Sequence, residues 1–208
     1  MIKVGLSGNR YSGKDRVSTL FEQISIPVFQ ADIVAKFILM YNYELQNDIM
    51  NKVGYEYFNQ DGLLDYNKVK SSGNFDKIID IIEPDLFNSY KRFNERNKES
   101  IYSIFHSSIL FERGWNKKMH YNINIFSSTN DRLERCKYLT KKTVSSIYNL
   151  AQGEMKDIDK SKHSDFVVHN YNDVNLTIGD CLTQVNKIDQ QIIDEYLKSE
   201  MSQKLIMV

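Results

Sequence analysis

The chain has 208 residues, and its 27 lysines and arginines balance 27 aspartates and glutamates, so its formal net charge at pH 7 is zero. This length suits a single α/β domain, and the balanced charge gives no general attraction for nucleic acid or an acidic membrane, so we expect a small-molecule ligand. Cys136 and Cys181 have neither metal-ligand spacing nor a disulfide framework, and no apolar run is long enough to span a membrane, so we expect a cytoplasmic protein.

The chain opens with an apolar run over residues 1–6, which predicts a buried parallel strand, and residues 17–24 have the spacing of an amphipathic helix. The glycine-rich segment between them is of the phosphate-binding type. Its two glycines allow N–H groups to turn inward above the positive end of the following helix, which favours an anion. Lys14 is expected to reach the outer phosphates of a nucleoside triphosphate. The residues predicted to bind ATP here are Gly8, Asn9, Arg10, Tyr11, Ser12, Gly13, Lys14, Asp15 and Arg16.

Asp15 departs from the usual form of this loop, which has Ser or Thr at this place to bring a hydroxyl to Mg²⁺. A carboxylate is a good oxygen ligand for Mg²⁺, but it also brings negative charge close to phosphate. We therefore expect altered rather than abolished magnesium binding, with Asp15 as a metal ligand. An aspartate is also favourable in the first turn of a helix, and this purely structural role stays open.

A second short strand is expected at residues 25–29, and it leads into a helix that begins near Asp32. Asp32 therefore lies where a strand passes into a helix. In a doubly wound sheet, such junctions line the edge at which ligands bind. Asp32 is thus a candidate for the reaction site, with an ordinary helix-start aspartate as the alternative.

Residues 41–98 contain no convincing strand and predict a helical insertion. Isoleucines over residues 78–82 indicate a helix that ends near Pro84 or restarts after it, because proline lacks the N–H group that a helix interior needs. A turn at residues 59–62 separates two segments rich in Tyr and Phe. Such aromatic side chains more often belong to a core than to a ligand platform, and both interpretations stay open.

Further strands are expected at residues 100–105 and 121–126, and the second runs into a cluster of Ser, Thr and Asn that favours the start of a helix. That helix carries Arg132 and Arg135, and another is expected to begin near Thr143.

The stretch from residue 153 to residue 164 is almost wholly polar, and we expect it to be mobile. Residues 132–164 together predict a lid, because phosphoryl transfer needs water to be excluded and charge to be neutralised. A solvated basic face is the alternative for its arginines and lysines. A last core strand over residues 165–170 and terminal helices over residues 174–208 complete the chain.

Repeated strand–helix units behind a phosphate-binding loop predict an α/β fold, with a mostly parallel sheet between two layers of helices. We expect a single domain over residues 1–208. Within it, residues 41–98 form the helical insertion that helps to bind the substrate.

Several separated segments resemble the dephospho-coenzyme A kinase family, over most of residues 1–172. The family's loop GGIGSGKST is similar to GNRYSGKDR, which begins at Gly8 in this chain. The family's V-x-D-A-D-x-x-A-R is similar to VFQADIVAK, which begins at Val28. Its turn DG-x-L-D resembles DGLLD at residues 61–65.

The resemblance continues through the second half of the chain. The family's LHP resembles IEP at residues 82–84, and its PLLFE resembles SILFE at residues 108–112. A glutamine near the end of its lid helix resembles Gln152, and its A-D-x-V-I-x-N resembles SDFVVHN, which ends at Asn170. The order and spacing of these segments carry the resemblance.

The resemblance implies a P-loop kinase that uses ATP and Mg²⁺ to phosphorylate the ribose 3′-hydroxyl of dephospho-coenzyme A, giving coenzyme A. Asp32 would accept the hydroxyl proton, a role that a carboxylate within hydrogen-bond reach can perform. Lys14 would hold the phosphates, and Arg132 or Arg135 would stabilise the transferred charge. Asn170 would lie near the adenine. The implied acceptor-binding residues are Asp32, Lys36, Phe58 and Glu112.

The chain departs from the family pattern in and near the expected site. Gln30 replaces the first aspartate of D-A-D, Lys36 the following arginine and Glu83 the histidine of LHP. An arginine often found before the lid helix falls near Leu139. Lysine keeps the charge of arginine but loses its two-pronged grip on a phosphate. Two other functions therefore stay open: a nucleoside or deoxynucleoside monophosphate kinase, and a nucleotide-binding protein that has kept the fold without the chemistry.

Overall fold

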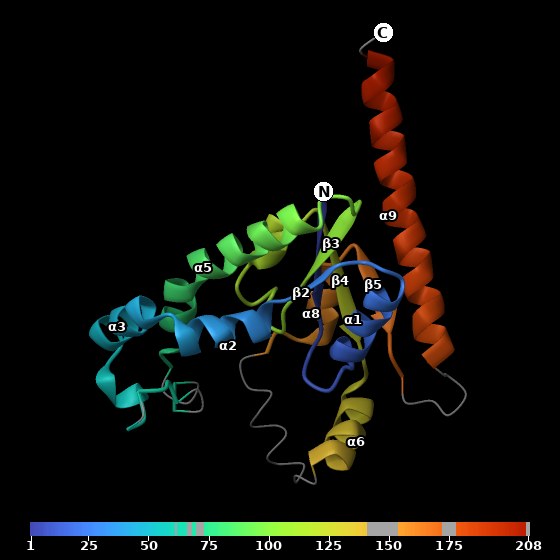
Figure 1. Cartoon of the computed structure of the whole chain (residues 1–208). Helices are drawn as coiled ribbons and strands as arrows, with labels where there is room; N and C mark the ends of the chain where they lie inside the picture. The colour runs from blue at the N-terminus through green and yellow to red at the C-terminus, as the bar shows by residue number, and fades with distance from the viewer. Residues whose placement is uncertain (61, 66–67, 70–72, 141–153, 172–177, 207–208) are drawn as a thin grey trace. The chain divides into compact units, whose positions relative to one another are not determined.

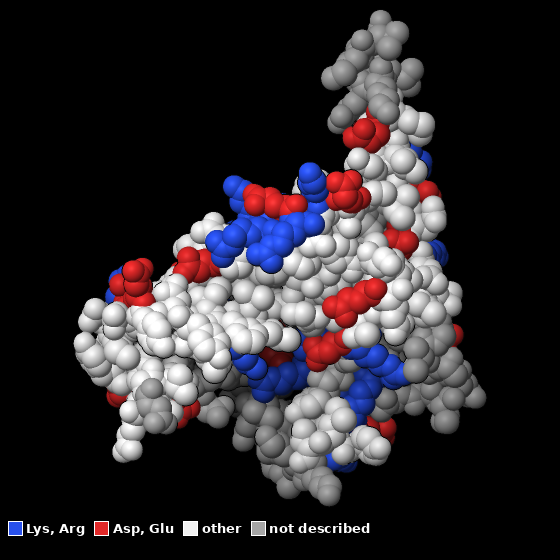
Figure 2. Space-filling model, in the orientation of Figure 1, with Lys and Arg blue, Asp and Glu red and all other residues white. Residues whose placement is uncertain are grey.

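The structure is a computed structural model that describes residues 1–60, 62–65, 68–69, 73–140, 154–171 and 178–206. The chain divides into two compact units, one of residues 1–29 with 97–208 and one of residues 30–96. The first unit is built around the sheet, and the second is helical (Figure 1). Acidic and basic side chains are interspersed on the face shown in Figure 2, in keeping with the net charge of zero. Within the described part of the chain, no helix is both long and apolar enough to cross a membrane.

The strands that the structure describes form one five-stranded sheet in the order β2-β3-β1-β4-β5. β1 pairs in parallel with both β3 and β4, and β4 pairs in parallel with β5. Because Leu6 lies level with His106 of β3 and Ile123 of β4, the carboxyl ends of these strands meet at one edge. The α/β fold expected from the sequence is confirmed. The strands are β1 (Ile2–Ser7), β2 (Val28–Gln30), β3 (Tyr102–His106), β4 (Tyr121–Phe126) and β5 (Phe166–His169).

Alternate residues of β1 face opposite sides of the sheet, as the geometry of a strand requires. Val4 and Leu6 are fully buried in a core that includes residues of α1 (Lys14–Gln23) and α9 (Ile178–Ile206). Gly5 faces the other side, where a Cβ atom would come within 2.7 Å of Cδ2 of Leu110. The segment that follows β3 therefore packs directly on the backbone of β1.

The polar residues of β4 explain a helix that the sequence did not predict. Asn124 is buried on the face of β4 opposite to the apolar core, and its Nδ2 donates to Oγ of Ser161 at 2.9 Å. Ser161 lies on α8 (Asp157–Lys162), which packs against β4. Within the polar stretch that was expected to be mobile, residues 157–162 thus form a helix. Asp157, Lys160 and Ser161 bond to partners on its inner side, whereas Asp159 and Lys162 pair at the surface.

The helical unit contains α2 (Ala31–Tyr41), α3 (Tyr43–Lys52), the short helix η1 (Tyr55–Tyr57) and α5 (Phe75–Arg96). Helices α2 and α3 each pack against α5, and α2 also contacts α3.

Helix α5 runs without a break through Pro84, so the expected helix end at this proline is wrong. The buried residues Ile78, Ile82, Leu86 and Tyr90 recur at helical spacing on both sides of the proline. One face of the whole helix therefore packs against α2 and α3. Pro84 lies on the exposed face. Water can therefore bond to the carbonyl group that loses its N–H partner, which keeps the penalty for an internal proline small.

Candidate active site

The phosphate-binding loop connects β1 to α1 and has the backbone form of an anion site. Tyr11 and Gly13 both have positive φ angles, of 61° and 87°. The N–H of Ser12 donates to the carbonyl oxygen of Asn9 at 3.0 Å, which closes a tight turn. Because α1 begins directly after the loop, inward N–H groups and the positive end of the helix act on the same place.

Arg135 and Asn170 hold this loop from two other segments. Nη1 of Arg135 donates to the carbonyl oxygens of Tyr11 at 3.0 Å and Ser12 at 3.2 Å, and to Oγ of Ser127 at 2.9 Å. Its Nη2 donates to the carbonyl oxygen of Asn170 at 2.7 Å. Nδ2 of Asn170 in turn donates to the Ser12 carbonyl at 2.7 Å, and it would collide with any Cβ atom on Gly13. Burial lowers the pKa of Arg135, which stays protonated because arginine is so basic.

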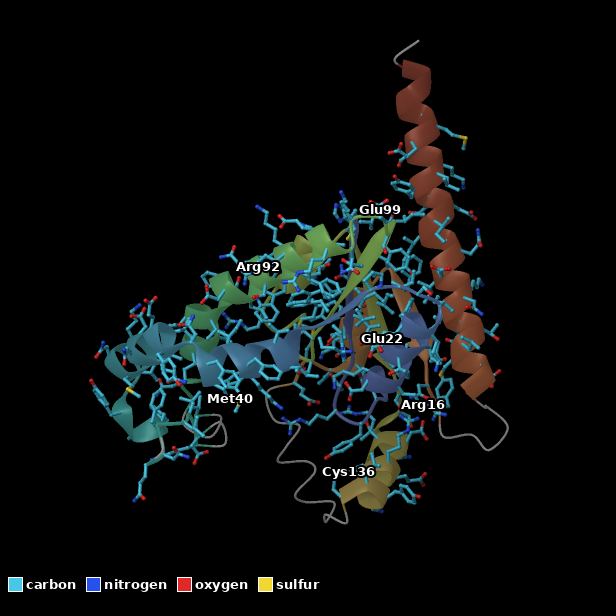
Figure 3. The ribbon with its side chains drawn as sticks, viewed as in Figure 1. Arg16, Glu22, Met40, Arg92, Glu99 and Cys136 are labelled. Carbon is cyan, nitrogen blue, oxygen red and sulfur yellow. The ribbon has the colours of Figure 1, made fainter. Side chains whose placement is uncertain are left out.

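Lys14 and Asp15 begin α1 with very different exposure. The Lys14 side chain is 13% exposed, whereas that of Asp15 is 82% exposed, and Nζ of Lys14 lies 3.7 Å from Oδ1 of Asp15. The same carboxylate oxygen lies 3.5 Å from Nε2 of His106, a buried histidine at the end of β3. Arg16 follows on the exposed face of α1 (Figure 3). His106 was not predicted, although its place directly after the strand expected at residues 100–105 was a signal that could have found it.

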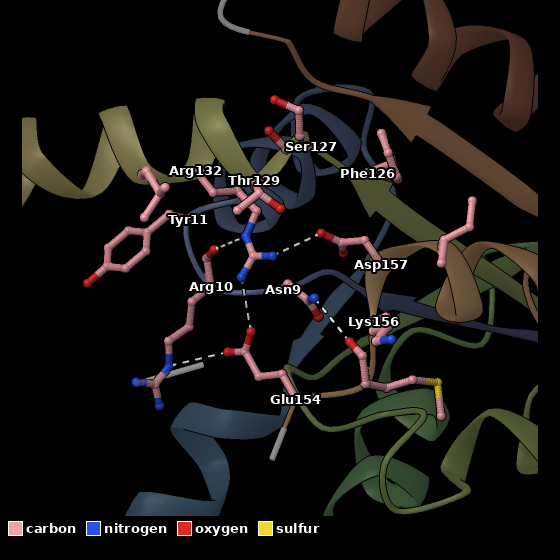
Figure 4. A pocket seen from close by; sticks show the side chains of 14 residues that line it. Asn9, Arg10, Tyr11, Phe126, Ser127, Thr129, Arg132, Glu154, Lys156 and Asp157 are labelled. Carbon is pink, nitrogen blue, oxygen red and sulfur yellow. Dashed lines mark hydrogen bonds and ion pairs between the residues drawn. The ribbon is translucent and has the colours of Figure 1, made fainter. Parts of the chain in front are cut away.

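A cavity of about 620 Å³ lies beside the loop and is lined by 14 residues (Figure 4). Arg132 of α6 (Thr129–Thr140) reaches into it and donates through Nε to the carbonyl oxygen of Arg10 at 2.8 Å. Its Nη1 donates to Asp157 and its Nη2 to Glu154, both at 3.1 Å. Glu154 also pairs with Nε of Arg10 at 3.5 Å. One carboxylate is therefore shared by two arginines at the wall of the cavity.

A buried ion pair holds the far wall of this cavity in place. Lys160 of α8 is fully buried, and its Nζ lies 2.8 Å from Oε1 of Glu112. The same oxygen accepts the N–H of Met155 at 3.0 Å, while the Met155 carbonyl accepts from Nδ2 of Asn9 at 3.0 Å. Burial raises the pKa of Asp157, against the opposing effect of Arg132 and Lys160. Glu112, predicted to bind the acceptor, is thus bound to α8 and the segment before it.

The remaining acceptor residues expected from the sequence belong to the helical unit. Asp32 is the second residue of α2 and is half-buried, and Lys36 lies one turn further along the same helix and is exposed. Phe58 is half-buried and forms an isolated antiparallel bridge with Leu64. The structure thus brings together the loop, Arg132, Arg135, Asn170 and Glu112 in the sheet unit, and it places Asp32, Lys36 and Phe58 in the other.

Some expected features lie outside the described residues: Asp61 of the turn, the helix near Thr143 and Gln152. In the part that is described, no three His, Cys, Asp or Glu side chains gather as a metal cluster.

Comparison with known proteins identifies relatives over nearly the whole chain. The family model described as Dephospho-CoA kinase matches residues 2–175. A dephospho-CoA kinase of Fusobacterium nucleatum is 25% identical over 194 residues, which cover 91% of this chain and 97% of that protein. One from Bacillus cereus is 27% identical over 176 residues, which cover 81% of this chain and 88% of that protein. The family expected from the sequence is therefore confirmed.

Solved structures show the same fold. A Thermus thermophilus protein matches with a TM-score of 0.77 and 19% identity, covering 91% of this chain and 96% of that one. The dephospho-CoA kinase from Campylobacter jejuni matches with a TM-score of 0.58 and 17% identity, with the same coverage of 91% and 96%. At these identities the likeness supports the fold, and the assignment to a family comes from the sequence match.

Proposed function

The chain belongs to the dephospho-CoA kinase family, and we propose that it transfers the γ-phosphoryl group of ATP to the ribose 3′-hydroxyl of dephospho-coenzyme A. The observation that carries this proposal is the family match across residues 2–175, which begins with the phosphate-binding loop. The product is coenzyme A. The acceptor is a small molecule, and the site of action is the cytoplasm.

The loop binds the triphosphate of ATP. Its backbone N–H groups and the start of α1 attract the phosphates, and Lys14, which is only 13% exposed, adds a positive charge close by. Arg135 supports the phosphates through the loop, because its guanidinium already fixes the carbonyl oxygens of Tyr11 and Ser12. Arg132 supplies charge from the cavity wall. Asn170 bonds to the loop, and from this place it would contact the adenine.

Asp15 would hold Mg²⁺. The fit is chemical: magnesium prefers hard oxygen ligands, and this carboxylate is 82% exposed at the end of the loop. The ion would supply positive charge that offsets the negative charge of the ATP phosphates. Lys14 lies 3.7 Å from the same carboxylate, so its charge offsets the repulsion between Asp15 and the phosphates.

Asp32 is the general base that takes the proton from the acceptor hydroxyl, a role in which a carboxylate contributes through position as much as through basicity. Its place directly after β2 supports this role, because ligands of such sheets bind where strands pass into helices. Lys36 and Phe58 contact the acceptor from the helical unit. Glu112 contributes by fixing the cavity wall through Lys160.

The test is a product analysis. The protein is incubated with ATP, Mg²⁺ and dephospho-coenzyme A, and in parallel with a panel of nucleoside monophosphates, and both ADP and the phosphorylated product are identified. Phosphate on the 3′-hydroxyl is the expected result. Diphosphate products would instead identify a nucleoside monophosphate kinase, and nucleotide binding without turnover would identify a protein that has lost the chemistry.

The control for this assay compares two lysines. Lys14→Met removes the charge at the phosphates and should abolish turnover, whereas Lys3→Met changes an exposed lysine at the start of β1 and should leave turnover intact.

A further inference from the structure

One buried histidine beside the phosphate-binding loop is not used by the reaction as described above. His106 is the last residue of β3, and its side chain is only 4% exposed. Because His106 lies level with Leu6 of β1, its ring stands at the edge of the sheet where the loop begins. Its Nε2 faces Oδ1 of Asp15 at a distance of 3.5 Å.

One of the two oxygens of the Asp15 carboxylate faces two nitrogen atoms. Oδ1 lies 3.5 Å from Nε2 of His106, a buried nitrogen, and 3.7 Å from Nζ of Lys14. The rest of the side chain is exposed to solvent, where a carboxylate without an anchor changes rotamer freely. His106, by contrast, is fixed by its burial at the end of a strand. Anchoring Oδ1 leaves Oδ2 as the oxygen that can face a cation.

We propose that His106 is a positioning residue, which orients the Asp15 carboxylate so that it presents Oδ2 to the magnesium ion that accompanies ATP. This inference rests on the proposed function, since it takes Asp15 as the magnesium ligand. Carboxylates that bind metals are commonly held by a second polar group, and that partner sets their orientation. Lys14 is a weaker candidate for this task, because its charge is needed at the phosphates.

The pair explains how the chain binds metal without the usual hydroxyl. Serine and threonine carry their hydroxyl one bond from Cβ, so the backbone largely sets its position. Aspartate has a further rotatable bond between Cβ and the carboxylate, so its oxygens need an outside partner to stay in place. In this chain the exchange of the hydroxyl for a carboxylate at residue 15 is accompanied by a histidine that faces it.

The test measures Mn²⁺ affinity directly, by electron paramagnetic resonance titration of the full chain in the presence of ADP. His106→Leu removes both ring nitrogens while keeping an apolar side chain, and it should weaken Mn²⁺ binding about 10-fold. The affinity for ADP in EDTA should not change, because the ring is proposed to act on the Asp15 carboxylate and not on the phosphates. His106→Gln, which keeps an amide nitrogen near the position of Nε2, should restore most of the Mn²⁺ affinity.

His120→Leu is the matched control. His120 is exposed, and its Nδ1 accepts the backbone N–H of Lys3 near the start of β1. This substitution should leave Mn²⁺ affinity unchanged.

A double-mutant cycle separates positioning from a general effect on the fold. In an Asp15→Ser background, His106→Leu should cause no further loss of Mn²⁺ affinity, because the carboxylate that it orients is gone. An unchanged affinity after His106→Leu alone, or an equal loss in both backgrounds, overturns the proposal. If the leucine variant fails to fold, His106→Asn takes its place in the cycle, since its amide is too short to reach Asp15.

The failure of this inference and that of the proposed function are distinguishable. Normal phosphorylation of dephospho-coenzyme A without coupling between residues 15 and 106 overturns the inference alone. Full coupling without phosphorylation of that acceptor overturns the proposed reaction alone.

Discussion

Beside the phosphate-binding loop of the sheet unit, several charged side chains are largely buried and bonded to the backbone or to other side chains, whereas α2 of the helical unit exposes its aromatic side chains. Arg135 makes four hydrogen bonds and Lys160 has no exposed surface. On and after α2, by contrast, Phe37, Tyr41 and Tyr43 are 55%, 64% and 74% exposed. The sheet unit thus has its charged groups fixed by bonds within the protein, while α2 of the helical unit leaves apolar surface exposed.

The exposed aromatic side chains of the helical unit line a shallow groove of their own. It has a volume of about 560 Å³ and includes Val34, Phe37, Ile38 and Tyr41. The rings of Phe37 and Tyr41 stack with centroids 5.9 Å apart, and Met40 is 43% exposed on the same helix (Figure 3). Other aromatics of this unit, such as Tyr57 and Tyr90, are buried. The core interpretation therefore holds for Tyr57 and Tyr90, and a role of the exposed aromatic residues in ligand binding stays a prediction.

The largest effect is expected from a substitution that tests whether a residue of the helical unit takes part in catalysis. Asp32→Asn removes the proposed base and should lower kcat by about 10²- to 10⁴-fold, with little change in ATP affinity. Steady-state kinetics and a separate ATP-binding titration measure the two effects. Asp48→Asn, an exposed aspartate on α3 that pairs with Lys52 at 2.8 Å, should leave kcat unchanged. Equal losses of kcat and ATP affinity in Asp32→Asn would contradict its role as base.

The buried ion pair of the sheet unit gives the next largest effect, on stability. Lys160→Met removes the positive charge that faces Glu112 and should lower the free energy of unfolding by about 3–5 kcal/mol. Lys162→Met, two residues away on the same helix, removes a 67%-exposed lysine that pairs with Asp159. This variant should change the free energy of unfolding by about 0–1 kcal/mol. Urea unfolding of both variants measures the difference. Equal effects would mean that burial does not distinguish the two pairs.

A smaller effect is expected at the cavity wall of the sheet unit, where the carboxylate of Glu154 already pairs with two arginines. Because Glu154 pairs with both Arg10 and Arg132, its carboxylate would compete with the phosphates of ATP for the two arginines. Glu154→Gln should therefore raise the affinity for ATP about 3- to 10-fold, measured by isothermal titration calorimetry. Glu22→Gln changes an exposed glutamate of α1 and serves as the control. A fall in affinity would show that Glu154 supports the site rather than competing for it.

The smallest effect on stability is expected on the exposed face of α2. Phe37→Ala should change the free energy of unfolding by no more than about 0.5 kcal/mol, because the ring is already largely in water. The KM for the acceptor should rise if this surface is covered by substrate. Tyr138→Ala, which changes an 88%-exposed tyrosine of α6 in the sheet unit, should alter neither quantity. A large loss of stability in Phe37→Ala would show that the ring belongs to the core.

The sequence predicted those parts of the fold whose signals are local. The bounds of β4 agree with the expected strand, and the loop between β1 and α1 was found because glycine spacing and a following lysine define it. The helix α8 over residues 157–162 was not predicted, because a stretch of polar residues is usually exposed to solvent. Only the fold brings Glu112 next to Lys160, and no periodicity within either segment reveals that pair.

The same distinction applies to the candidate site. Lys14 and Arg135 were found through their residue types and places in the chain, but their partners were not. Arg135 was expected at the transferred phosphate, and in the structure its guanidinium bonds to the backbone of the loop. His106 escaped notice because its importance depends on the register between β1 and β3, which sequence patterns leave undetermined.

The attachment of Arg135 has a consequence for any effort to move this loop into another protein. One guanidinium joins the loop to Ser127, just beyond β4, and to Asn170, just beyond β5. A graft of residues 8–16 alone would thus lose the clamp that keeps Tyr11 and Gly13 in their left-handed backbone angles. The transplantable unit is the loop together with the ends of two further strands and one helix, a discontinuous module rather than a peptide.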